Sequence, residues 1–130
     1  MENNAVKNKS RTNKKRKSTP TKLVDGTVCY TMAVRYPSDM MDALRLLCYE
    51  KKFSNMTETI FYCIEEHDKR KLMTSEVVKF NKKDATALTI RFREKHYEYI
   101  NSVCAIKTFK TFSNGILHIV FEFLKAEERI

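Results

Sequence analysis

The chain carries an internal repeat that aligns without a gap. A shift of 56 positions places residues 27–74 on residues 83–130. Apolar character is largely kept, and the identical pairs are Arg35/Arg91, Cys48/Cys104, Lys51/Lys107, Phe53/Phe109, Ile60/Ile116, Glu66/Glu122 and Lys69/Lys125. A unit of this size removes too little surface from water to be stable alone. We therefore expect the two copies to build one domain together.

The first 22 residues differ from the rest in charge. They hold eight Lys or Arg against Glu2 alone, so they contribute +7 of the chain's net charge of +9. Polar residues fill the gaps, and such a segment cannot offset the entropy cost of ordering itself. We predict a disordered basic arm over residues 1–25, attracted to phosphate rather than serving only as a solubilising tail. Its candidate phosphate contacts are Lys14, Lys15, Arg16 and Lys17, a run that also has the form of a nuclear import signal.

Several classes of protein do not fit this composition. No apolar run approaches the ~20 residues that cross a membrane, so we expect no membrane partner and a cytoplasmic location, or a nuclear one in a eukaryotic cell. Cys63 and His67 lie one helical turn apart, but no further ligand completes a metal site. The three His occupy unrelated positions in the repeat, and two Gly in the whole chain exclude a phosphate-cradling loop. We expect no metal, no cofactor and no enzyme activity.

The first copy predicts a strand followed by two helices. Residues 28–36 alternate apolar and polar side chains, which is typical of a strand with one buried face. Pro37 ends that strand, and Ser38 is expected to cap a helix that runs to about residue 51. Asn55 and Glu58 have the spacing of a capping box, which predicts that a second helix starts there and continues to about residue 67.

The second copy repeats this order. A strand is predicted around residues 87–92, a helix over 97–104 and a final helix over 112–123, capped by Thr111. A lone strand would leave unpaired backbone groups, so we expect the two strands to pair antiparallel about a pseudo-twofold axis. The predicted fold is α+β, mainly α, with four helices behind a two-stranded antiparallel ribbon. The domain covers 26–130, with unit one at 27–68, a linker at 69–84 and unit two at 85–128.

This pattern resembles the ribbon-helix-helix family of DNA-binding proteins, of the Arc and MetJ type. The stretch from Tyr30 to Ser38 is similar to the family's strand, and the two following helices have its spacing. The resemblance implies that the outer ribbon face enters the major groove of double-stranded DNA. It also implies phosphate contacts at the start of each second helix. The implied base contacts are Thr31, Ala33, Arg35, Ala87, Thr89 and Arg91; the implied phosphate contacts are Ser54, Asn55, Met56, Lys110, Thr111 and Phe112.

Two units in one chain are similar to the tandem members of that family that act in conjugation and T-DNA transfer. That resemblance implies a relaxosome accessory factor, with a relaxase or a coupling protein as possible partners. The alternative is a transcriptional or plasmid-maintenance repressor, and RNA-binding or protein-interaction modules are less favoured. The two reading strands differ in sequence, so the chain could bind an asymmetric site in one orientation, which suits directional DNA processing.

The final helix carries a second apolar stripe. Leu117, Phe121 and Leu124 recur at helical spacing, where the first copy has Phe61, Glu65 and Asp68. One apolar face is enough for the core, so the stripe predicts a surface for self-association or for a partner. The alternative is that the linker covers it with Val77, Val78 and Phe80.

Overall fold

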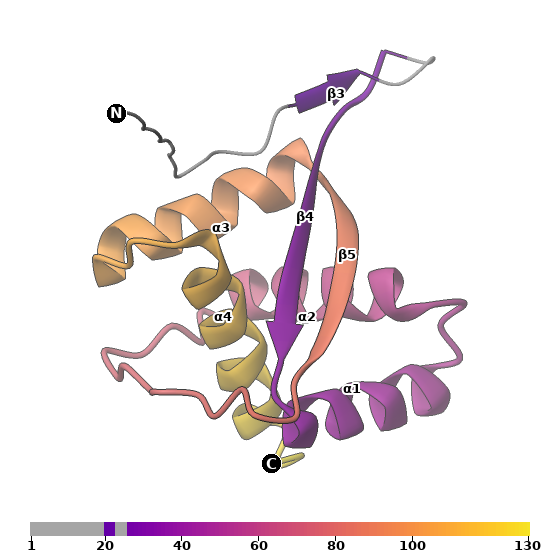
Figure 1. Cartoon of the computed structure of the whole chain (residues 1–130), viewed down its shortest axis with the longest axis vertical. Coiled ribbons are helices and arrows are strands. Elements are labelled where there is room, and N and C mark those ends of the chain that lie inside the picture. Colours follow the sequence, from indigo (N-terminus) through magenta and orange to yellow (C-terminus); the bar gives the residue numbers. More distant parts are fainter. Residues whose placement is uncertain (1–19, 23–25) are drawn as a thin grey trace, which may run out of the picture.

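The computed structural model describes residues 20–22 and 26–130, and it is an α+β fold, about half helical (Figure 1). The candidate contacts Lys14, Lys15, Arg16 and Lys17 lie outside the described residues. Among the described residues, no helix is long and apolar enough to cross a membrane. In chain order the elements are β3 (Pro20–Lys22), β4 (Val28–Tyr36), α1 (Ser38–Lys51), α2 (Met56–Lys69), β5 (Thr86–Arg93), α3 (Glu94–Lys107) and α4 (Phe112–Ala126).

The two long strands, β4 and β5, pair antiparallel along their whole length, as predicted. Ala33 lies opposite Thr89, its own equivalent in the repeat, so the pseudo-twofold axis passes between these two residues. The strands alternate because one face is buried: Val34, Tyr36 and Phe92 are at most 2% exposed. This register therefore puts the opposite face of both strands toward solvent.

A third strand was not predicted. β3 pairs antiparallel with the start of β4, with Thr21 opposite Cys29, and Gly26, just before β4, adopts a positive φ (91°). The Cys29 thiol is 2% exposed and donates a weak hydrogen bond to the Thr21 carbonyl oxygen (3.6 Å). The prediction of a two-stranded ribbon is wrong, and so is the prediction of disorder at Pro20–Lys22, because these residues pair with β4 and close its edge.

Both second helices begin as predicted. Asn55 Oδ1 accepts a hydrogen bond from the Glu58 N–H (2.9 Å), and Thr111 Oγ1 accepts one from the Asn114 N–H (3.2 Å). The first helices differ from prediction. The residue before α1 is Pro37, so Ser38 is not the cap, and Asp39 Oδ1 accepts a hydrogen bond from the adjacent N–H instead.

The remaining boundaries follow from backbone geometry. α3 starts at Glu94, three residues before the first apolar position used to predict it, because a polar first turn gives no periodic signal. The turns between paired helices contain no Gly, yet Lys52 and Thr108 adopt left-handed backbone angles (φ 60° and 59°). The two copies therefore share the same backbone conformation at these equivalent positions, although it is sterically unfavourable for a residue with a side chain.

The core lies between the sheet and the four helices, with α2 and α4 forming the central helix pair (Figure 1). Gly115 allows α3 and α4 to approach closely. A Cβ at this position would overlap the Cys104 sulphur and lie 3.3 Å from the Ile100 carbonyl oxygen. The first copy has Thr59 here, so the two helix pairs are not packed identically.

The predicted second stripe of α4 is covered within the chain. Leu117 and Leu124 are 0% exposed, and the Phe80 ring from the linker packs edge-on against Phe121 (5.6 Å between centroids). The prediction of an open contact surface on this stripe is therefore wrong. The cause is the linker, whose Phe80 and Val78 cover the helix while Val77 stays 64% exposed.

Candidate nucleic-acid interface

The outer face of the ribbon brings together all six predicted base-contacting residues. Thr31, Ala33 and Arg35 of β4 and Ala87, Thr89 and Arg91 of β5 are all exposed. The pairing arranges them in three rows across the two strands: Thr31 with Arg91, Ala33 with Thr89, and Arg35 with Ala87.

The two arginines lie in the two outer rows, one at each end of the set of three. Arg35 and Arg91 are separated by four residues along the strand direction, which is roughly 13 Å at strand spacing. Arg35 Nη2 makes only a long contact to the Ala85 carbonyl oxygen (3.5 Å). Its guanidinium is therefore available to a ligand at little cost in lost bonds.

The starts of α2 and α4 flank the paired strands on opposite sides (Figure 1), where phosphate contacts were predicted. At α2 the exposed residues Ser54 and Asn55 precede the half-buried Met56. Glu58 Oε1 accepts a hydrogen bond from the Ser54 N–H (2.9 Å). A carboxylate thus already occupies a backbone donor at this helix start, and its charge opposes the approach of phosphate.

At α4 the surroundings are different. Lys110 and Thr111 are exposed, Phe112 is half-buried, and no acidic residue lies in the first turn. Asn114 stands where the first copy has Glu58. The two helix starts are therefore equivalent in the repeat but opposite in their electrostatics.

A shallow pocket of about 500 Å³ opens beside α4, between that helix and the linker. Its floor includes His118, whose Nε2 accepts a hydrogen bond from the Val78 N–H (2.9 Å). Its lining residues are Val77, Val78, Lys79, Phe80, Lys82, Phe109, Asn114 and His118. Sequence analysis missed this site, although the lysine-rich composition of the linker could have indicated it.

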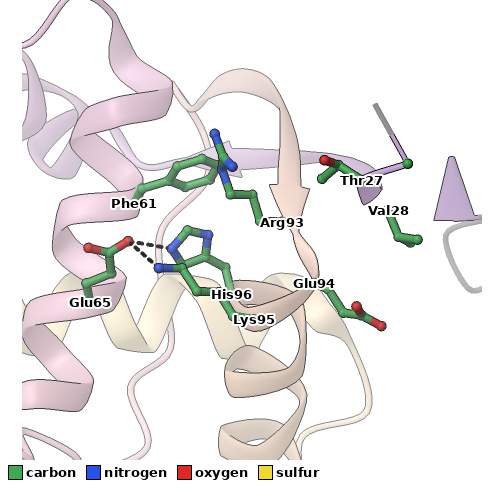
Figure 2. A pocket seen from close by; sticks show the side chains of 9 residues that line it. Thr27, Val28, Phe61, Glu65, Arg93, Glu94, Lys95 and His96 are labelled. Carbon is green, nitrogen blue, oxygen red and sulfur yellow. Dashed lines mark hydrogen bonds and ion pairs between the residues drawn. The ribbon is translucent and has the colours of Figure 1, made fainter. Parts of the chain in front are cut away.

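A second pocket, of about 650 Å³, lies where β5 runs into α3 (Figure 2). Lys95 and His96 point from the start of α3 toward α2, where Glu65 contacts both of them (3.5 and 2.8 Å). Burial raises the pKa of Glu65, but its hydrogen bond from His96 and the charge of Lys95 outweigh that and hold the pKa below its usual value.

The charges around this second pocket balance. Arg93 and Lys95 line it together with Glu94 and Glu65, and burial lowers the pKa of His96 despite its hydrogen bond to Glu65. The histidine–carboxylate pair joins two helices, because Glu65 belongs to α2 and His96 to α3.

A buried polar network lies at the junction of α2, α3, α4 and the linker. The Glu122 carboxylate accepts hydrogen bonds from His67 Nε2, Lys107 Nζ and Thr74 Oγ1, each at 2.7 Å. Burial raises the pKa of Glu122, but these three hydrogen bonds outweigh it and bring the pKa to about 2. Both ring nitrogens of His67 are engaged, since Nδ1 lies 2.7 Å from the Tyr99 hydroxyl.

Comparison of this chain with models of protein families, with curated proteins and with solved structures finds no match in any of the three.

Proposed function

We propose that this chain is a sequence-specific double-stranded DNA-binding protein of tandem ribbon-helix-helix form, which reads bases with the outer face of β4 and β5. The observation that carries the proposal is the register centred on Ala33 and Thr89. It brings two arginines, two threonines and two alanines onto one exposed face, with an arginine on each side of the axis.

The dimensions of the ribbon support this mode of binding. Paired strands lie about 4.8 Å apart, and the major groove of B-DNA is about 12 Å wide, so a two-stranded ribbon fits with its side chains. The third strand lies beside Val28–Tyr30, one row outside Thr31. The described residues of β3 therefore do not pair alongside the three rows that carry the proposed base contacts.

The arginines are the residues that can discriminate bases most strongly. An arginine side chain can donate two hydrogen bonds to guanine O6 and N7, which is worth about 1–3 kcal/mol of discrimination against the wrong base. Arg35→Ala and Arg91→Ala should each relax specificity, at different base pairs of one site, because the two half-sites are inequivalent. Thr31 and Thr89 should show smaller effects of the same kind.

Selection of binding sites from a random duplex library, followed by competition with single-base variants, tests this proposal. Both arginines are exposed, so the variants should remain folded and should lose far less affinity for random DNA than for the selected site. The proposal fails if the library yields no preferred site, or if both variants keep the parent's affinity and base preferences.

Within DNA binding, we propose the role of an accessory factor at an origin of DNA transfer, with a relaxase or coupling protein as partner. The inequivalence of the two reading strands supports it, because an asymmetric reading head can fix one orientation on DNA. Sequencing of the fragments that the protein retains from its own replicon tests the role. Recovery of a nick region beside a relaxase gene is expected, whereas recovery of the protein's own promoter would instead indicate a repressor.

A further inference from the structure

The linker between the two units is fixed against α4. The Val78 N–H donates to His118 Nε2, and His118 Nδ1 lies 2.8 Å from the Asn114 carbonyl oxygen. The Phe80 ring packs edge-on against His118 (4.9 Å between centroids). Lys79 lies between these two attachment points, so its backbone is held beside α4.

The pocket formed in this way is cationic. Lys79 and Lys82 line it together with Asn114 and His118, and its lining residues include no acidic side chain. Exposed Lys110 precedes the nearby start of α4, whose first turn contains no acidic residue. Lysine side chains bind phosphate as point charges, and the helix dipole at this end has the same sign.

The corresponding place in the first copy has the opposite character. Glu58 replaces Asn114, and its carboxylate bonds the Ser54 N–H at the start of α2. Tyr62 replaces His118 and therefore offers no imidazole acceptor to a neighbouring segment. A phosphate is favoured on one side of the ribbon and opposed on the other.

We propose that Lys79 and Lys82 of the linker, with Lys110, form a binding site for a phosphate of the DNA backbone, and that this anchor exists beside the second unit only. The inference rests on the proposed function and deepens it. The linker is then a part of the DNA-binding surface as well as a connection, and it holds the second half of the ribbon against its half-site.

The salt dependence of DNA binding tests the anchor. The probe is a fluorescent duplex of mixed sequence. The double variant Lys79→Gln/Lys82→Gln should reduce the slope of log affinity against log salt by ~0.9 for each lost phosphate contact. The matched control, Lys51→Gln/Lys52→Gln, removes the same charge from exposed positions at the end of α1 and should change the slope much less. Glu58→Gln, which removes the opposing carboxylate, should raise affinity for the same duplex.

A second measurement does not require DNA binding. Titration of the ¹⁵N-labelled protein with inorganic phosphate should shift the amide signals of Lys79, Lys82 and Asn114, and not those of Ser54 and Glu58. Shifts at the pocket without binding to any duplex would leave the site standing and overturn the proposed function. Equal loss of slope in both lysine variants, or an unchanged slope in the linker variant, would overturn the one-sided anchor.

Discussion

Glu122 lies where α4 meets α2, α3 and the linker, and its carboxylate accepts a hydrogen bond from each of them. An ionised carboxylate can only accept, so His67 Nε2 must carry a proton, while Nδ1 lies within hydrogen-bond distance of the Tyr99 hydroxyl. Lys107 is 4% exposed, and its ammonium also donates to the Glu76 carbonyl oxygen (2.7 Å). These bonds make a buried ion pair tolerable at a junction of four segments.

Glu122→Gln should lower the free energy of unfolding by about 3–5 kcal/mol, because it leaves the Lys107 charge buried without its counter-charge. Urea denaturation measures this change. The control is Glu66→Gln at the equivalent position of the repeat, where Arg70 is 37% exposed and the loss should be about 1 kcal/mol or less. Equal losses of unfolding free energy in the two variants would show that burial does not increase the contribution of the Glu122–Lys107 pair to stability.

Individual contacts of this kind could not be read from the sequence. Lys51/Lys107 and Glu66/Glu122 are identical pairs in the repeat, which gave no reason to expect different contacts. In the second copy the lysine and the glutamate pair, whereas in the first copy Lys51 lies over the Tyr62 ring and Glu66 pairs with Arg70. The linker contributes to both arrangements in different ways, because its Thr74 donates to Glu122 whereas its Arg70 pairs with Glu66.

At the scale of elements, periodicity located β4, β5 and the cores of all four helices, because each buries one face. β3 escaped prediction since Pro20–Lys22 has no apolar alternation and is held only by pairing with β4. The second stripe of α4 was read as a surface because its cover lies about 40 residues earlier, in a polar linker. The exposure of the positions proposed to contact bases followed from strand alternation, whereas the lysine pocket depends on a tertiary contact.

Two histidines join elements that are distant in sequence, which gives the fold a pH dependence. His96 links α3 to Glu65 of α2, with Lys95 and Arg93 nearby, and His118 links α4 to the linker, with Lys107, Glu122 and Glu76 nearby. Burial lowers the pKa of both residues, although the hydrogen bonds to Glu65 and to the Asn114 carbonyl oppose it. His118 must be unprotonated to accept from the Val78 N–H.

Stability should therefore fall as pH drops below about 6.5, because the unfolded chain takes up protons there that the folded chain resists. Urea midpoints measured on either side of that pH should show the loss. In His96→Met, which introduces the residue found at the equivalent Met40, part of this dependence should disappear. A midpoint that stays constant or rises on acidification would contradict the assignment of neutral histidines.

At the scale of the whole molecule, one chain supplies what a homodimer would obtain by association. β4 of the first copy pairs with β5 of the second, and α2 packs on α4. Folding should therefore not depend on meeting a second chain. The melting temperature should be unchanged on ~100-fold dilution, whereas an associating fold melts at a temperature that rises with concentration.

Calorimetry or circular dichroism over that dilution series measures the effect, with sedimentation as the check on mass. A melting temperature that falls on dilution would mean that the two copies pair between chains by swapping.

The polar links between the two copies are each made in one direction only. His67 of the first copy contacts Glu122 of the second, and His96 of the second contacts Glu65 of the first. The mirrored positions cannot repeat these bonds, since Phe123 stands in the place equivalent to His67.

This one-way bonding bears on the history of the duplication. A chain built from two second copies would bury a glutamate against Phe123 with no imidazole, and one built from two first copies would offer Met40 to Glu65. Each half depends on residues that only the other half has. The two halves are therefore not interchangeable, because replacing either half with a copy of the other would remove the contacts that join them.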